Sequence, residues 1–133
     1  MGYLIDTNHL SPLITAEHRL RTHVLHELKN GSKFYLSPLV LSEFLYGILL
    51  LPRAAANERA WHEIASEFEY IHFEAEDAIQ AAKLRVALRK RGKQFAFVDA
   101  FVAVLALRNN LTLLTTDQDF AAIPTLSIEN WLS

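Results

Sequence analysis

Short apolar runs alternate with segments of helical spacing along the chain, and this alternation restricts the possible folds more than any other feature. The expected strands are residues 2–6, 33–36, 68–73, 111–115 and 126–128. The expected helices are residues 12–29, 39–51, 53–67, 74–91 and 95–108. Such alternation favours an α/β fold, a sandwich in which helices cover both faces of a mostly parallel sheet. Ligands of these folds bind at the carboxyl ends of the strands.

Two of the expected helices are unusually apolar. Ser37 followed by Pro38 is typical of an N-cap and a first helical position, so a helix should begin there. Residues 39–51 are apolar nearly all round, and residues 95–108 form an apolar run too long for a strand. We expect both helices to be largely buried.

The bulk properties favour a soluble, cytoplasmic protein with a single domain over residues 1–133. The chain has no Cys, which fits a reducing compartment. We see no signal peptide, and the longest apolar stretch is shorter than the roughly 20 residues that span a bilayer. The net charge of -2 counts mildly against a nucleic-acid partner, unless clustered acids hold a cation.

Two carboxylates stand in apolar surroundings. Asp99 is the only charged residue between Lys93 and Arg108, and Glu43 is the only one in the apolar helix over 39–51. An unpaired buried carboxylate is costly, so it takes up a proton or finds a cation, an Arg or a metal. A neutral, hydrogen-bonded Asp or a solvated Glu at a rim remains an alternative for each residue alone.

Three further acids follow expected strands. Asp6 ends the first strand, and Asp117 and Asp119 come directly after the strand over 111–115. Each could merely cap a turn or a short helix. Taken together with Glu43 and Asp99, they form a set of carboxylates that would repel one another without a cation. Carboxylate oxygens suit Mg²⁺ or Mn²⁺, which can activate a water for attack on phosphorus.

At this point the sequence resembles the PIN domain family and, more closely, VapC-type toxins of bacterial toxin–antitoxin pairs. In chain order, the matching segments are Leu-Ile-Asp-Thr-Asn at 4–8, Ser-Glu-Phe-Leu-Tyr-Gly at 42–47, Gly-Lys at 92–93 with Asp-Ala-Phe-Val-Ala at 99–103, and Leu-Leu-Thr-Thr-Asp-Gln-Asp-Phe at 113–120. The resemblance covers essentially the whole chain and implies a PIN-like α/β/α sandwich.

The resemblance also implies an activity. PIN domains are divalent-metal nucleases that cut single-stranded RNA and leave a 5′-phosphate and a 3′-hydroxyl. VapC-like members act on tRNA or ribosomal RNA loops, form homodimers and are silenced by a cognate antitoxin. The catalytic and metal-binding residues carried over are Asp6, Glu43, Asp99 and Asp117, with Asp119 as a further metal ligand. Thr7 and Thr115 are candidates for supporting these carboxylates or positioning a phosphate.

Two departures from the family pattern affect the expected metal site. Many relatives carry an additional acid two residues before the third motif's Asp, where this chain has Phe97. We therefore expect a leaner metal site, or one that holds one ion firmly and not two. The last motif offers two acids; we prefer Asp117 because it lies closer to the strand end, and Asp119 would bind through water or simply cap.

Three other features have two interpretations each. The basic residues between positions 85 and 93 could follow an RNA backbone, or they could match the dipole of a helix end. Leu49, Leu50, Leu51 and Trp61 could form a groove for an antitoxin helix, or they could belong to the core. His9 lies near the expected site without an assigned role.

Other functions fit the acids less well. A phospho-receiver domain needs paired acids after its first strand, and an Asp-x-Asp phosphatase fails because Asn8 replaces the second Asp. The remaining alternative is a PIN-like domain that has lost catalysis and serves only as a binding or assembly module.

Overall fold

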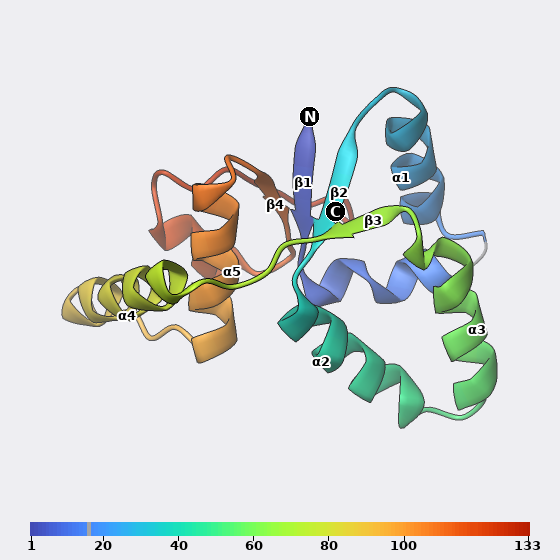
Figure 1. Ribbon diagram of the computed structural model, residues 1–133, viewed down its shortest axis with the longest axis horizontal. Helices are drawn as coiled ribbons and strands as arrows, with labels where there is room; N and C mark the ends of the chain where they lie inside the picture. Colours follow the sequence, from blue (N-terminus) through green and yellow to red (C-terminus); the bar gives the residue numbers. More distant parts are fainter. Residues whose placement is uncertain (16) are drawn as a thin grey trace.

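The sheet is the centre of the fold in the computed structural model, which describes residues 1–15 and 17–133 (Figure 1). Within these residues, five strands form one sheet in the order β3-β2-β1-β4-β5, and every neighbouring pair is parallel. The strands are β1 Gly2–Ile5, β2 Lys33–Leu36, β3 Phe68–Tyr70, β4 Thr112–Leu114 and β5 Ile128–Glu129. The expected α/β sandwich with a mostly parallel sheet is confirmed.

The helices divide between the two faces of the sheet. They are α1 Arg19–Lys29, α2 Pro38–Leu49, α3 Ala54–Ala65, α4 Ala75–Lys90 and α5 Phe97–Arg108, with 3-10 helices η1 Thr7–His9, η2 Ser11–Ile14 and η3 Gln118–Ala122. Figure 1 shows α1, α2 and α3 on one side and α4 and α5 on the other. Right-handed crossovers require this division, because the chain moves outward from β1 to β3 and then returns to place β4 on the other side of β1.

The observed helix ends follow the capping signals of the sequence. The Ser37 side chain accepts a hydrogen bond from the Leu39 amide, and Pro38 takes the first turn of α2 as predicted. At the start of α4, Glu74 and Asp77 form a reciprocal capping box.

None of the helices in the described part of the chain is long and apolar enough to cross a membrane.

Three expected elements need correction. The helix over 12–29 is interrupted: η2 ends at Ile14, Thr15 is extended, and α1 begins only after the His18 side chain caps its first turn. Residue 16 of that range lies outside the described residues. The strand expected over 68–73 ends at Tyr70, where pairing with β2 ends. The last strand is Ile128–Glu129, since its residues pair with Leu113 and Leu114 of β4.

The expected burial of the two apolar helices is correct for one of them. In α5, every residue from 102 to 106 is buried. In α2 only one face is buried, formed by Val40, Phe44 and Ile48, whereas Leu50 after its end is 69% exposed. The prediction that α2 is largely buried was therefore wrong, because the helix has neighbours on one side only. This exposed face carries one of the candidate acids.

Candidate active site

The candidate acids meet where the order of the sheet reverses. β1 leads to β2 on one side, while β4 pairs with β1 on the other, and their carboxyl ends lie next to each other. Asp6 directly follows β1, and its amide donates to the Leu114 carbonyl at the end of β4 at 3.0 Å. Asp117 follows β4 by three residues. Open parallel sheets bind their ligands at such a reversal.

Asp6 is the best-anchored of the five acids. It is 8% exposed, and its two carboxylate oxygens accept hydrogen bonds from the Thr115 hydroxyl at 2.8 Å, the Thr7 amide at 2.9 Å and the Asn8 side-chain amide at 3.2 Å. Burial raises the pKa of Asp6 and outweighs these hydrogen bonds, which lower it; the charges of Glu43 and Asp117 raise it further. Asp6 is therefore a fixed carboxylate in a negative field.

Threonines in the loops after β1 and β4 form hydrogen bonds to Glu43 and Asp117. The Thr7 hydroxyl donates to Glu43 Oε1 at 2.8 Å, which joins α2 to the end of β1. Glu43 itself is exposed, since it lies on the open face of α2 and not in a buried helix as expected. The Asp117 amide donates to the Thr115 hydroxyl at 3.0 Å. Thr7 and Thr115 thus support the carboxylates, as the sequence suggested.

The two acids of the last motif differ in position. The Asp117 carboxylate caps η3 by accepting the Asp119 amide at 2.9 Å. Asp117 contributes to the raised pKa of Asp6, whereas Asp119 does not. Asp119 is exposed and Asp117 is half-buried. The charges of both Asp117 and Asp119 act on Asp99, so the choice of Asp117 as the fourth acid stays a prediction.

Asp99 lies in the first turn of α5 and lacks a partner. No described residue hydrogen-bonds to its carboxylate, and the two ion pairs in the described part of the chain involve other residues. Burial raises the pKa of Asp99 to about 6, and the charges of Asp6, Asp117, Glu43 and Asp119 contribute in that order. All five candidate acids are thus close enough to interact, without a protein cation to balance them.

The donor set of this cluster suits a hard cation. It consists of carboxylate and hydroxyl oxygens, which Mg²⁺ and Mn²⁺ prefer. Among the described residues, no group of three Asp, Glu or His side chains is already arranged to hold a metal ion. The chemistry therefore fits a divalent cation, but side chains must move toward one another for the ion to bind.

Asn8 is a site residue to which the sequence analysis gave no role. Its Nδ2 donates to Asp6 and, at 3.3 Å, to Thr115 Oγ1, while its Oδ1 accepts the Thr116 amide at 3.1 Å. Asn8 thus joins the ends of β1 and β4. Its position within the Asp-Thr-Asn segment was the available signal, but the direction of its amide depends on the fold.

His9 fixes the orientation of that amide. The Trp131 amide donates to His9 Nε2 at 3.1 Å, so this nitrogen carries no proton, and Nδ1 is the one that donates to Asn8 Oδ1 at 2.7 Å. His9 is 1% exposed, and burial lowers its pKa to about 4, which agrees with a neutral ring. Residues near the carboxyl end thereby support the loop after β1.

The surfaces singled out from the sequence are only partly as expected. Leu49, Leu50 and Leu51 are exposed at the end of α2. Trp61 is buried in the core against Phe44 and Phe68, so it does not form part of an open groove. Phe97, which replaces the additional acid of the family pattern, is 56% exposed at the start of α5.

Comparison with known proteins adds independent information. The family profile of the PIN domain matches residues 3–126. The chain is 29% identical over 132 residues to Ribonuclease VapC2 of Rickettsia felis, with 98% of each covered. It is 24% identical over 133 residues to the tRNA(fMet)-specific endonuclease VapC of Salmonella typhimurium, again with 98% of each covered. The crystal structure of VapBC2 from Rickettsia felis, bound to a DNA fragment from the promoter, is similar with a TM-score of 0.86 and 28% identity, covering 98% of this chain and 99% of that chain.

Proposed function

The chain belongs to the PIN-domain family, which confirms the resemblance seen in its motifs, and from this premise we propose that it is a metal-dependent endoribonuclease. The proposed substrate is single-stranded or loop RNA, of the tRNA or ribosomal RNA class, in the cytoplasm. The observation that carries the proposal is that the charges of four other acids act on Asp99, whose carboxylate is half-buried and has no hydrogen-bond partner among the described residues.

The residues that would hold Mg²⁺ or Mn²⁺ are Asp6, Glu43, Asp99 and Asp117, with Asp119 contributing through water. When bound, the cation lowers the pKa of a water for in-line attack and stabilises the departing 3′ oxygen. Asp6 would keep its position while the others adjust, because three hydrogen bonds anchor it. The Glu43 side chain is exposed and accepts one hydrogen bond, from the Thr7 hydroxyl, so it is free to rotate toward the other acids.

Thr115 would couple the two strand ends during this adjustment. Its hydroxyl donates a hydrogen bond to the Asp6 carboxylate, and its oxygen accepts one from the Asp117 amide. One side chain therefore sets the separation between an acid after β1 and an acid after β4. This arrangement fixes the Asp117 backbone relative to the Asp6 carboxylate and leaves the Asp117 side chain able to adjust.

We propose that the protein also acts as the toxin of a toxin–antitoxin pair and forms a homodimer. The Rickettsia felis relative has been crystallised as VapBC2. Here the exposed Leu49, Leu50 and Leu51 offer an apolar surface for an antitoxin. Exposed Ile79 on α4 offers a second apolar surface, on the other side of the sheet, for another copy of the chain.

The test is cleavage of a mixture of tRNA and ribosomal RNA by the purified protein with Mg²⁺, Mn²⁺ or EDTA. We expect discrete fragments that require metal and disappear in Asp99→Asn. Glu63→Gln, an exposed acid on α3, is the control for the loss of one negative charge and should cleave normally. Comparing Asp117→Asn with Asp119→Asn identifies the fourth acid, since only the true ligand should abolish cleavage.

The same experiment separates a catalytic from a binding role. Cleavage by Asp99→Asn at the rate of the parent would rule out the proposed site. If metal raises the melting temperature of the parent but no RNA is cut, the protein is a PIN-like binding or assembly module without catalysis.

A further inference from the structure

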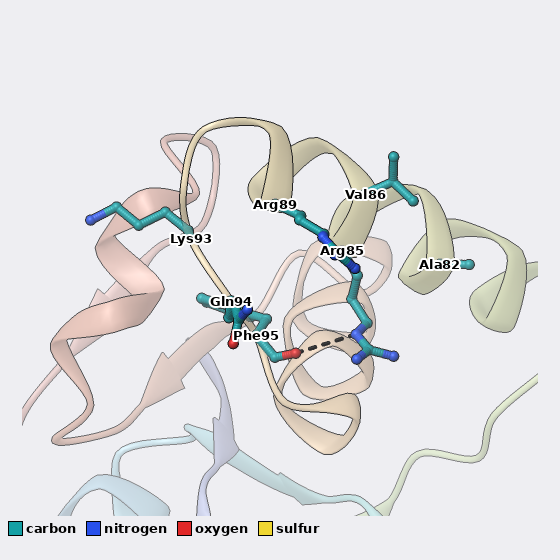
Figure 2. A pocket seen from close by; sticks show the side chains of 7 residues that line it. All are labelled: Ala82, Arg85, Val86, Arg89, Lys93, Gln94 and Phe95. Carbon is teal, nitrogen blue, oxygen red and sulfur yellow. Dashed lines mark hydrogen bonds between the residues drawn. The ribbon is translucent and has the colours of Figure 1, made fainter.

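A basic groove lies between α4 and the loop that leads to α5 (Figure 2). Its lining residues are Ala82, Arg85, Val86, Arg89, Lys93, Gln94 and Phe95. The lining includes three cations and no acid. The groove has a volume of about 500 Å³, within the range of ligand-binding clefts. Strong positive charge is thus concentrated on a protein whose net charge is -2.

The cations of the groove have no counter-charge. Arg85 donates its Nε to the Phe95 carbonyl at 3.2 Å (Figure 2), a bond that leaves its charge without a carboxylate partner among the described residues. No described acid forms an ion pair with Arg85, Arg89 or Lys93. Arg85 and Arg89 are four residues apart on α4, a spacing at which like charges destabilise a helix. An anionic ligand would remove this repulsion.

Helix-dipole matching explains only part of this charge. The dipole acts within the last turn of a helix, and Arg89 and Lys90 already occupy that turn of α4. Arg85 lies one turn earlier, and Lys93 lies beyond the end of the helix. The gathering of the three cations on one groove therefore needs another explanation, which the sequence left open.

The loop that lines the groove is connected to two elements of the acid cluster. Phe95 in its wall precedes Asp99 in the chain by four residues, across the start of α5. On the other side, Arg91 of the same loop donates to the Ala122 carbonyl at 2.7 Å, at the end of the 3-10 helix that Asp117 caps. The loop over 91–96 therefore links the groove to both elements that present Asp99 and Asp117.

We propose that this groove, whose loop leads to Asp99, binds the phosphate backbone of RNA, an inference that rests on the proposed nuclease function. Arg85 and Arg89 present guanidinium groups that match phosphate oxygens, and Lys93 adds a mobile point charge. The contacts involve backbone phosphates and are independent of base sequence. The groove also answers the objection raised by the net negative charge, because it attracts RNA to a region whose carboxylates repel it.

The test compares two charge-matched double variants. Arg89→Gln/Lys93→Gln removes two groove cations that make no described contact, and Arg59→Gln/Lys29→Gln removes two exposed cations on α3 and α1. The probe is a fluorescently labelled single-stranded RNA oligonucleotide in EDTA, where cleavage is blocked. Binding is measured by anisotropy between about 50 and 200 mM salt.

The salt dependence gives the expected magnitude. Each phosphate contact with single-stranded nucleic acid contributes about -0.7 to the slope of log K against log salt. Loss of two contacts should make the slope of the groove variant shallower by about 1.4, while the control variant keeps the slope of the parent. Equal affinity and slope in parent and groove variant would overturn the proposal, as would a parent that does not bind RNA.

A second arm identifies the ligand class. In the same anisotropy assay, polyglutamate is added as a competitor of the labelled RNA. If the groove variant loses polyglutamate binding but keeps RNA binding, the groove receives an acidic protein and the proposal is wrong. Groove-dependent RNA binding by a parent that cuts no RNA with Mg²⁺ or Mn²⁺ would support the groove and refute the nuclease function, so the two failures are distinguishable.

Discussion

Asp99→Asn should stabilise the metal-free protein while abolishing its activity. The pKa of Asp99 is about 6 in the folded chain, compared with 3.8 as its ordinary value. Because the folded state holds the proton more tightly, the parent loses stability as the pH rises from about 4 to about 6, and it does not regain it above that range. Asn carries no charge at any pH, so the variant lacks this loss.

The magnitude follows from the same pKa difference. At 1.36 kcal/mol per pKa unit, the difference corresponds to about 3 kcal/mol if the carboxylate were fully shielded from water. Asp99 is only half-buried, and solvent screening reduces the effect to about 1.5 kcal/mol. Loss of a favourable helix-dipole interaction in the first turn of α5 subtracts about 0.5 kcal/mol. We expect a net gain of about 1 kcal/mol at pH 7, or about 4 °C in Tm.

The assay is thermal unfolding of the parent, Asp99→Asn and Glu63→Gln in EDTA from pH 4 to pH 7. The parent and Asp99→Asn should agree near pH 4 and diverge above it, whereas Glu63→Gln should follow the parent throughout. Added Mg²⁺ or Mn²⁺ should raise the Tm of the parent more than that of Asp99→Asn. A gain that does not vary with pH, or an Asp99→Asn variant less stable than the parent at pH 7, would refute the argument that burial and neighbouring like charges disfavour the Asp99 carboxylate.

Two further predictions concern the supports of the site and the core. His9→Asn keeps a donor near Asn8 and loses the acceptor for the Trp131 amide, whereas His9→Gln keeps that acceptor and loses the donor. If the ring acts by orienting Asn8, His9→Asn should retain a higher kcat and a higher metal affinity than His9→Gln at comparable Tm. The opposite order in single-turnover cleavage and Mn²⁺ titration would show that His9 only anchors Trp131. Arg108→Met leaves the buried Asp77 carboxylate without its partner and should cost about 3–5 kcal/mol in urea unfolding at pH 7, a loss that Asp77→Asn/Arg108→Met should largely recover.

The alternation of strands and helices in the sequence was sufficient for the fold class. The apolar runs located the strands, because a parallel sheet buries its strands on both faces. The helical spacing of apolar residues and the capping residues located the helices that connect them. The interruption at Thr15 was missed, since the apolar positions on either side of it keep helical spacing although the backbone of Thr15 itself is extended. The ends of the last strand were also wrong, because pairing with β4 and not hydrophobicity sets them.

The acids were identifiable from the sequence because charge in apolar surroundings is costly and needs a reason. Their type and order named the candidate site and its family. The sequence also made Glu43 seem buried. A sequence shows how apolar a helix is, but it does not show how many faces of that helix pack against other elements. Tertiary packing left the outer face of α2 open and placed Glu43 on it.

The sequence by itself therefore determined the order of the strands along the chain, the residue types available for chemistry and the capping of the helices, which all depend on local geometry. The tertiary structure alone decided how the strands order in the sheet, which brings residues 6 and 115 into contact across 109 positions of the chain. It also decided the direction of the Asn8 amide and the exposure of Glu43. Each of these depends on contacts between segments far apart in the chain, and a local pattern carries no information on such contacts.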